Sequence, residues 1–445
     1  MTKRVTVFSR HLAKRGALQR LLELEKALST IFGSVEGKPE ALEGVKVVEL
    51  SYANFAGIIT GTILAELGAE VIKIEPPSGD PARRITPYGV NVNGIGIPFL
   101  MESRNKYYVT LDLNDEEGRE KFKKLASQVD IVIDAFKPGF LDSLGVGYKE
   151  LRNLNKGLIY VAISPYGHTT SRGEKLRNIP DTDLTAQAGS GYPMTFGDPK
   201  EPEPYNYPLR AGLWAAWYMT ALLAAASTLV ALFHKFKTGE GQFIDIASHD
   251  VITSWIGASP IWGFLFKRPR VRIGEFDWTL YPYGFFTCKD GLVTVACVRD
   301  EDFRGLLKIL KLWRLEDDWK YLLDRITDDI DRLKSLNQEL NKAMANFTQD
   351  EIVKKALDYS AKSARSRLRA GGFPIVVKAL TPSQVLKEEH WHIRNTFVHV
   401  DHPSLGRFIV PAPVPKMSET PPRVKWIKCN VGEDNELIYK KYGLL

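Results

Sequence analysis

Two aspartates and a glutamine in the stretch "RNIPDTDLTAQAGSG" (residues 177–191) have types and a spacing that could do chemistry. Asp181 and Asp183 follow a loop that ends in proline, and Gln187 comes one helical turn after Asp183. A partly desolvated carboxylate among oriented dipoles is an effective nucleophile. An aspartate at the start of an uncharged run could equally cap a helix. The residue types alone leave both roles open for either aspartate.

Four short runs rich in valine and isoleucine predict the strands that would position this stretch. They cover residues 45–50, 69–75, 130–136 and 158–164, and they mostly lack two-fold alternation. That pattern is typical of strands covered on both faces. Helical stretches such as 60–67 and 115–128 lie between the strands. The order therefore predicts an α/β fold with an open, mostly parallel, Rossmann-like sheet and right-handed crossovers.

Ligands of such sheets bind outside the carboxyl ends of the strands. The loops at that edge begin at Ser51, Pro76, Lys137 and Pro165, and the last of them runs on to Asp183. The first loop, "SYANFAG", is not a G-x-G-x-x-G sequence. A nicotinamide or flavin dinucleotide site of the Rossmann type is therefore disfavoured.

The length and the change of pattern along the chain predict more than one domain. With 445 residues, the chain is too long for one average domain. We expect a helical extension at 1–43, a large α/β domain at 44–260 and a smaller α+β domain at 261–385. A C-terminal segment, 386–445, should return to the large domain. Residues 281–298 alternate like a hairpin with a turn at Lys289-Asp290-Gly291, and charged helices follow at about 301–370.

The composition indicates a soluble protein and argues against nucleic acid as a partner. Residues 1–22 hold six basic and no acidic side chains, and without them 54 basic residues face 53 acidic ones. The net charge of +7 therefore does not form a basic face on the body of the chain. Three distant cysteines predict neither disulfides nor a metal site, which favours a reducing compartment, the cytoplasm.

One run of 23 uncharged residues, 211–233, is long enough to cross a bilayer. About half of it is alanine, glycine, serine and threonine, and no other run in the chain is comparable. We therefore predict a fully buried helix at a domain or subunit core and no membrane association.

Seven ordered segments between residues 43 and 445 carry a more specific pattern. They are "LEGVKVVELS", "LAELGAEVIKIEPPSGDPARR", "SRNKYYVTLDL", "FKPGFLDSLGVGYKEL", "DTDLTAQAGSG", "KTGEGQFIDIA" and "HPSLGRFIVPAPVPKMSETP". Because these segments occur together and in this order, the chain resembles the family III CoA-transferases. That group contains formyl-CoA, carnitine and 2-hydroxyacyl CoA-transferases and the α-methylacyl-CoA racemases.

The resemblance implies that Asp183 is the catalytic carboxylate and that Asp181 is not. In the family this aspartate forms a mixed anhydride with the acyl group of an acyl-CoA and then an aspartyl-CoA thioester. An acceptor carboxylate attacks that thioester, and CoA passes to it. Asn54 in "SYANFAG" matches the polar side chain that lies near the reacting carbonyl in the family.

Coenzyme A, as part of the acyl-CoA substrate, is the implied ligand, with no metal. The residues that match CoA-holding positions of the family are Arg83, Arg84, Arg104, Lys106, Phe136 and Lys137. Two segments depart from the family pattern. The family often reads Glu-Asn-Phe where this chain has Asp134-Ala135-Phe136, and a glycine-rich segment is replaced by "HTTS" at 168–171.

The departures leave two alternatives to an active acyl-CoA:carboxylate CoA-transferase. One is a non-catalytic or modified subunit of a heteromeric enzyme such as benzylsuccinate CoA-transferase. The other is an α-methylacyl-CoA racemase, although racemases of the family place a histidine where this chain has Thr182. The resemblance also implies an interlocked dimer, either a homodimer or a heterodimer with a paralogous subunit.

Overall fold

The computed structural model describes Glu23, Lys26 and residues 29–445 apart from 170, 268–269, 278, 328, 366–371 and 404. Of the predicted extension at 1–43, residues 1–22 lie outside this description, and residues 29–32 are helical. The chain divides into two compact units. The large unit holds the residues up to Tyr192, then Ala211–Ile256 and Glu389–Leu445, and the small unit holds Pro193–Arg210 and Gly257–Glu388.

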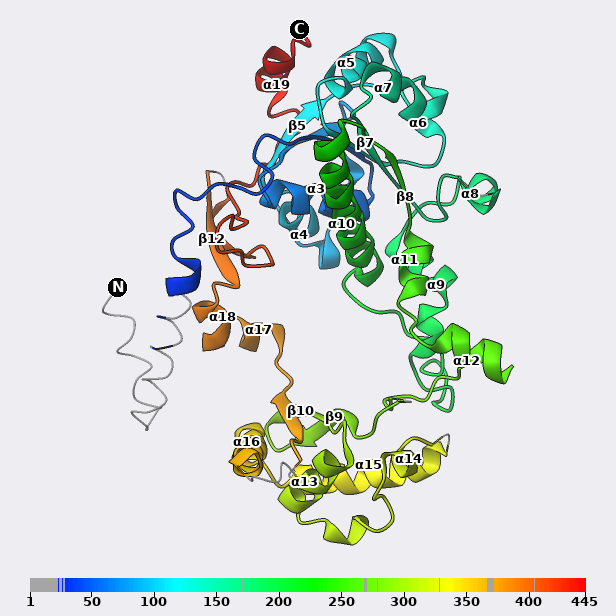
Figure 1. Cartoon of the computed structure of the whole chain (residues 1–445), viewed down its shortest axis with the longest axis vertical. Coiled ribbons are helices and arrows are strands. Elements are labelled where there is room, and N and C mark those ends of the chain that lie inside the picture. Colours follow the sequence, from blue (N-terminus) through cyan, green and yellow to red (C-terminus); the bar gives the residue numbers. More distant parts are fainter. Residues whose placement is uncertain are drawn as a thin grey trace. The chain divides into compact units, whose positions relative to one another are not determined.

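A six-stranded parallel sheet forms the centre of the large unit (Figure 1), which confirms the predicted fold class. Its strand order is β5-β2-β1-β6-β7-β8. The strands are β1 (Lys46–Ser51), β2 (Glu70–Glu75), β5 (Lys106–Thr110), β6 (Ile131–Ala135), β7 (Ile159–Ser164) and β8 (Phe243–Ala247). The four strands predicted from the sequence are β1, β2, β6 and β7. The prediction missed β5 and β8, the two edge strands.

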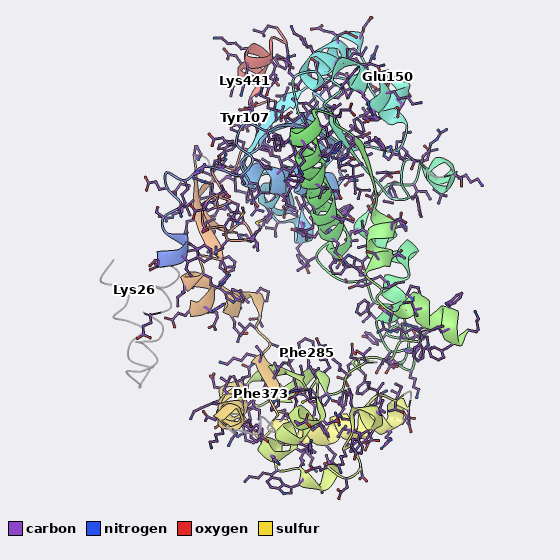
Figure 2. All side chains as sticks on the ribbon, in the orientation of Figure 1. Lys26, Tyr107, Glu150, Phe285, Phe373 and Lys441 are labelled. Atoms are coloured by element: carbon purple, nitrogen blue, oxygen red, sulfur yellow. The ribbon has the colours of Figure 1, made fainter. Side chains whose placement is uncertain are left out.

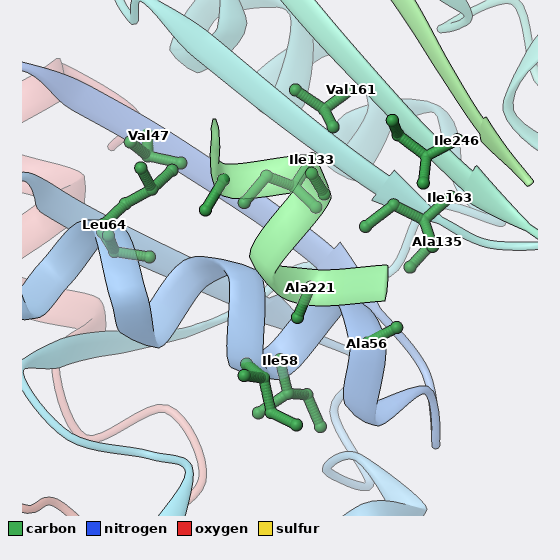
Figure 3. Close-up of a cluster of buried hydrophobic side chains, with 14 of the residues drawn as sticks. Val47, Ala56, Ile58, Leu64, Ile133, Ala135, Val161, Ile163, Ala221 and Ile246 are labelled. Atoms are coloured by element: carbon green, nitrogen blue, oxygen red, sulfur yellow. The ribbon is translucent and has the colours of Figure 1, made fainter. Parts of the chain in front are cut away.

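Helices cover both faces of the sheet, and side chains fill the layers between them (Figure 2). Successive strand residues point to opposite faces. Val47 accordingly packs with α3 (Phe55–Glu66) and α10 (Ala215–Thr238), as Figure 3 shows for the surrounding cluster. Val48 packs on the other face with α5 (Glu116–Ala126) and α7 (Tyr148–Leu154). This double burial explains why the central strands read as continuous apolar runs.

The uncharged run predicted as a fully buried helix is the core of α10. Its small residues, including Ala221, Ala224 and Thr228, are buried against the rest of the large unit. Val230 and Phe233 on its other side are more than half exposed. The prediction of complete burial is therefore wrong for the single chain. By length and composition α10 could span a membrane, and half of its most apolar window is buried inside the protein.

Further short elements complete the large unit. Along the chain they are η1 (Pro81–Arg84), η2 (Pro87–Gly89), β3 (Asn91–Val92), β4 (Ile95–Gly96), α4 (Ile97–Met101), α6 (Phe140–Ser143), α8 (Ser171–Leu176), α9 (Asp183–Ser190), α11 (Ser248–Ser254), α18 (Glu389–Ile393), β12 (Phe397–His402), β13 (Gly406–Pro411) and α19 (Asn435–Tyr442). A 3₁₀ turn, η3 (Tyr192–Thr195), lies where the chain passes into the small unit.

The C-terminal segment covers the free edge of β5 without adding a strand. The Asp434 carboxylate accepts a hydrogen bond from the Tyr108 N–H at 2.9 Å, and the Asp434 N–H donates to the Tyr108 carbonyl at 3.0 Å. The side chain of Asn435 accepts one from the Thr110 N–H at 2.9 Å. The edge strand therefore has its main-chain groups occupied by the tail of the chain.

The small unit contains a three-stranded antiparallel sheet, in the order β11-β10-β9. The predicted hairpin is confirmed as β9 (Tyr283–Cys288) and β10 (Gly291–Ala296), with Cys288 opposite Gly291 across the turn. The third strand is β11 (Ile375–Lys378). The helices of this unit are α12 (Ser259–Phe266), α13 (Asp300–Leu310), η4 (Trp313–Leu315), α14 (Leu322–Arg325), α15 (Ile330–Met344), α16 (Gln349–Arg365) and α17 (Pro382–Val385).

Candidate active site

A cavity of about 600 Å³ lies in the large unit at the carboxyl edge of the central sheet. Its lining includes Ser51 at the end of β1 and Pro76, Lys137 and Pro165, which come after β2, β6 and β7. These are the four positions at which the sequence predicted ligand-binding loops to begin. The lining continues through residues 178–182, so the cavity ends one residue before Asp183. Its volume is typical of sites for small molecules and cofactors.

Asp183 is the first residue of α9, and its carboxylate faces the start of α10. One oxygen accepts hydrogen bonds from the backbone N–H groups of Ala216 and Trp217, at 2.8 and 3.2 Å. The side chain is almost completely buried, since the residue is 5% exposed. A helix N-terminus stabilises an anion through these N–H groups and through its dipole. Both of these donors are uncharged backbone groups.

Gln187 supplies the hydrogen bond to the second oxygen of Asp183, at 2.7 Å. The same amide nitrogen donates to the carbonyl of Ala211 at 3.1 Å, and the amide oxygen accepts from the Ala211 N–H at 2.9 Å. The orientation of the Gln187 amide is therefore fixed from both ends. The sequence placed Gln187 one turn after Asp183 but did not predict its role.

Neither aspartate is the N-cap of α9. Thr182 takes that position, and its hydroxyl accepts a hydrogen bond from the Thr185 N–H at 3.1 Å in a capping box. Asp181 instead reaches across to two other elements. One of its oxygens accepts hydrogen bonds from the Ser248 hydroxyl at 2.9 Å and from the Asn54 amide at 3.3 Å. Burial, together with the nearby charge of Asp183, raises the pKa of Asp181 to about 6.

Asn54 is buried, is the N-cap of α3 and lines the cavity. Its amide oxygen accepts a hydrogen bond from the Gly57 N–H at 3.2 Å, while its amide nitrogen donates to Asp181. Ser248, which the sequence analysis missed, is the first residue of α11 directly after β8. Because β8 is parallel to its neighbours, the sheet rule would have pointed to Ser248 had this edge strand been recognised.

A glycine allows α9 and α11 to come together at this point. A β-carbon added to Gly189 would lie 1.9 Å from the imidazole nitrogen Nε2 of His249. That ring also stacks on Tyr166, and its other nitrogen lies 2.6 Å from the Pro165 carbonyl oxygen. The close approach brings Ser248 within reach of Asp181.

Of the six residues matched to CoA positions, two line the cavity. They are Lys137 and Phe136, and the Phe136 ring packs on Phe140 at a centroid distance of 5.0 Å. Arg84 is exposed in the last turn of η1 and lies outside the lining.

The other three cations are not among the lining residues and lie in buried ion pairs, although Glu75, the partner of Arg83, does line the cavity. Lys106 contacts Glu49 at 2.7 Å and the Ile58 carbonyl at 2.6 Å. Arg83 contacts Glu75 at 2.9 Å. Arg104 contacts Glu66 at 2.9 Å and donates to the Pro411 carbonyl at 2.9 Å.

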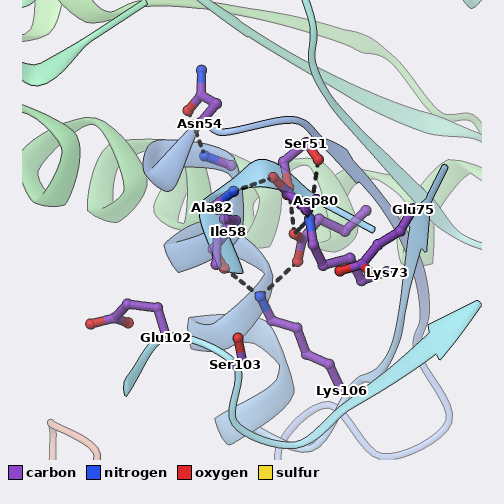
Figure 4. A network of polar contacts seen from close by, with 12 residues as sticks. Ser51, Asn54, Ile58, Lys73, Glu75, Asp80, Ala82, Glu102, Ser103 and Lys106 are labelled. Atoms are coloured by element: carbon purple, nitrogen blue, oxygen red, sulfur yellow. Dashed lines mark hydrogen bonds and ion pairs between the residues drawn. The ribbon is translucent and has the colours of Figure 1, made fainter. Parts of the chain in front are cut away.

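Lys106 and Arg83 belong to a charged cluster beneath the first loop of the sheet, formed by Glu49, Lys73, Glu75, Asp80, Arg83 and Lys106. Figure 4 labels Lys73, Glu75, Asp80 and Lys106 of this cluster. Lys73 is fully buried and contacts Asp80 at 2.8 Å and Glu49 at 3.2 Å. Burial alone would raise the pKa of Asp80, but Lys73 and two backbone N–H groups hold it below its usual value. In this cluster every buried carboxylate has a cationic partner.

Within the described part of the chain, no group of three or more histidine, cysteine, aspartate or glutamate side chains is arranged to hold a metal ion. His168, the first residue of the segment that replaces the family's glycine-rich one, is not among the residues that line the cavity. Its backbone N–H donates to Asp245 at 2.9 Å, and its ring lies edge-on to Phe243.

Comparison with known proteins adds a family and several relatives. The family model described as CoA-transferase family III matches residues 42–435. The α subunit of succinyl-CoA–L-malate CoA-transferase from Chloroflexus aurantiacus is 31% identical over 392 residues, which cover 86% of this chain and 84% of that one. Human succinyl-CoA:glutarate CoA-transferase is 29% identical, over 85% of this chain and 80% of its own. A crystal structure of a CAIB/BAIF family protein from Brucella suis matches with a TM-score of 0.72 and 26% identity, over 91% of this chain and all of that one.

Proposed function

This chain belongs to CoA-transferase family III and is a CoA-transferase, and we propose that it moves CoA from an acyl-CoA to a free carboxylic acid with Asp183 as its nucleophile. The observation that carries this proposal is the setting of Asp183. It is a buried carboxylate that directly follows the residues of the cavity lining, and it accepts hydrogen bonds from Ala216, Trp217 and Gln187. Hydrogen bonds of this kind orient a carboxylate, and partial desolvation makes it a better nucleophile.

The reaction proceeds in four acyl-transfer steps, each of which forms one bond to a carbonyl carbon and breaks another. The Asp183 carboxylate attacks the thioester carbonyl, and the CoA thiolate leaves from a mixed anhydride. The thiolate then attacks the Asp183 carbonyl of that anhydride, which releases the donor acid and forms an aspartyl-CoA thioester. The acceptor carboxylate attacks this thioester, which gives a second anhydride and frees the thiolate again. Attack of the thiolate on the acceptor's carbonyl makes the new acyl-CoA and restores Asp183.

Asn54 is the proposed donor to the carbonyl oxygen on which negative charge develops. It lines the cavity, and its amide nitrogen carries a second hydrogen besides the one donated to Asp181. Removing one such donor typically slows an acyl transfer by about a hundredfold to a thousandfold.

For CoA itself we propose Lys137 and Phe136 at the cavity, with Arg84 reaching the phosphates from the surface. Lys137 and Phe136 line the cavity, and Arg84 is exposed. Arg83, Arg104 and Lys106 would act indirectly, because their charges neutralise buried carboxylates. The named relatives use succinyl-CoA, which makes succinyl-CoA the first donor to test.

A subunit of a larger enzyme is the second candidate, because one relative is the α subunit of a CoA-transferase. The exposed apolar residues Val230 and Phe233 of α10 support a partner chain, as do Phe264 and Leu265 of α12. We propose a dimer, with an identical or a paralogous partner, in the cytoplasm. Sedimentation at micromolar concentration should give twice the mass of the chain, and a monodisperse monomer would contradict the dimer.

Trapping the covalent intermediate tests the proposed nucleophile. The protein is incubated with succinyl-CoA, treated with hydroxylamine or borohydride, digested and analysed by peptide mass. We expect the modification on Asp183 and none in an Asp183→Ala variant, while the exposed Asp250→Asn serves as a control that keeps it. A modification on Asp181 would overturn the assignment. Binding of acyl-CoA without any adduct would favour the non-catalytic subunit.

A further inference from the structure

We propose that Asp181 is a positioning residue, whose carboxylate fixes the Asn54 amide so that one of its N–H groups remains directed to the substrate carbonyl. The inference rests on the proposed function and deepens it. It assigns a role to the second aspartate of the pair, for which the sequence offered only local structure.

The hydrogen bonds around Asn54 define a single orientation of its amide. The amide oxygen takes the Gly57 N–H, and the amide nitrogen faces a carboxylate oxygen of Asp181. Turning the amide over would set two donors against each other at Gly57 and two acceptors against each other at Asp181. Among the described residues the amide nitrogen donates to Asp181 alone, so one N–H is left on a side chain that lines the cavity.

Asp181 is itself held by a third element. The Ser248 hydroxyl at the start of α11 donates to the same oxygen that receives Asn54. The three side chains therefore join the segment before α9, the start of α3 and the start of α11. A change at Asp181 would release Asn54 and leave the recorded hydrogen bonds of Asp183 in place.

The surroundings of Asp181 do not favour a charged carboxylate, which argues against a purely structural role. Its second oxygen is buried and accepts no hydrogen bond within the described residues. The ionisable group recorded as acting on it is Asp183, which disfavours its charge. His249 follows Ser248 on α11 and packs against Tyr166 and Pro165, and Lys137 is the lysine of the cavity lining. An asparagine could take the same place at less cost, so the acidic residue points to a demand for a strong acceptor.

A double-mutant cycle tests whether Asp181 acts through Asn54. In transfer from succinyl-CoA we expect Asp181→Asn to lower kcat about tenfold with KM changed less than twofold, and Asn54→Ala to lower kcat about a hundredfold. The double variant should be no slower than Asn54→Ala alone. Asp250→Asn on the exposed side of α11 is the control and should match the wild type. If the two losses in kcat multiply in the double variant, or if Asp181→Asn has the kcat of the wild type, the proposal is overturned.

The pH profile gives a readout that a purely structural role would not move. Because the ionised form of Asp181 holds Asn54, kcat should fall as the pH drops through about 6. Ser248→Ala removes a donor to that ionised form, so the acid limb should shift to higher pH by roughly half a unit. If Ser248→Ala leaves the pH of the acid limb unchanged, the role of Asp181 is contradicted.

A spectroscopic experiment keeps the inference testable even if the wild-type protein transfers no CoA. That outcome would defeat the proposed function, whereas positioning of Asn54 can be read from its side-chain amide resonances in protein labelled with ¹⁵N-asparagine. We expect a pH-dependent shift with a midpoint near 6 that Asp181→Asn abolishes. A shift that persists in Asp181→Asn, or no shift in the wild type, would contradict the inference.

Discussion

Two groups of buried or partly buried carboxylates lie in the large unit and are stabilised in different ways. In the charged cluster Glu49, Glu75 and Asp80 each contact a lysine or an arginine. At the candidate site Asp181 accepts hydrogen bonds from an amide and a hydroxyl, and Asp183 accepts hydrogen bonds from amides. Among the described residues no cation is recorded as acting on Asp181, and a desolvated charge of this kind is costly to fold, so its presence indicates a use other than stability.

The largest difference between the two groups should appear when Asp183 is changed. Asp183→Asn keeps the shape of the side chain but removes the nucleophile, so transfer should fall at least about a thousandfold. The melting temperature should fall by only several degrees, because the amide oxygen can keep the hydrogen bonds from the α10 N–H groups, while the bond from Gln187 to the second oxygen is lost. Steady-state transfer and thermal unfolding measure the two effects. Turnover at a tenth of the wild-type rate would remove Asp183 from the mechanism.

The reverse pattern is expected for the charged cluster. Lys73→Met leaves Glu49 and Asp80 without this partner and should cost about 3–5 kcal/mol in the free energy of unfolding. Urea unfolding measures it. The matched control is Lys121→Met, which removes a surface pair with Glu117 and should change the same quantity by less than about 0.5 kcal/mol. Equal effects of the two variants would mean that the cluster does not carry stability.

A third test uses the sign of the pH dependence at Asp181. The folded protein raises the pKa of this carboxyl to about 6 from its ordinary value of 3.8, so its favourable contribution is present at low pH and is lost as the pH rises through 6. Asp181→Asn should therefore be more stable than the wild type at pH 7.5, by about 2 kcal/mol. The advantage should shrink between pH 6 and pH 4. Urea unfolding at several pH values measures it, and a variant less stable at pH 7.5 would show that the charge is structural.

The smallest expected effect distinguishes Lys137 from Lys106, two lysines that both match CoA-holding positions of the family. Lys137→Met should raise the KM for succinyl-CoA about three- to tenfold and leave the urea midpoint unchanged, because Lys137 lines the cavity. Lys106→Met should leave KM within twofold and lower the midpoint, because this lysine is buried against Glu49. A large rise in KM for Lys106→Met, with stability intact, would return Lys106 to the CoA site.

The fold was largely predictable because the central strands are buried on both faces and read as apolar runs. The edge strands escaped detection for a physical reason: β5 begins with Lys106, and β8 has Asp245 at its middle. The sheet rule located the cavity from the ends of the strands. It could not show that Asp181 meets Asn54, because the two residues are 127 positions apart.

The cations show where sequence patterns stop being informative. Arg83, Arg104 and Lys106 stand in the same kind of basic segments as Arg84 and Lys137. Their difference arises from Glu75, Glu66 and Glu49, acidic partners that the fold brings beneath them. A charge that binds a ligand and a charge that neutralises a neighbour look identical until the partners are placed.

The way the tail occupies the edge of β5 has a consequence for biosynthesis. Asp434 and Asn435, which bond to the main chain of Tyr108 and Thr110, follow these partners by 326 and 325 positions and are therefore translated long after β5. Until they leave the ribosome, an otherwise complete sheet presents an open edge, and open edges invite pairing with other nascent chains. A chain truncated before Asp434 would keep every residue of the candidate site and still present the open edge of β5, which favours aggregation.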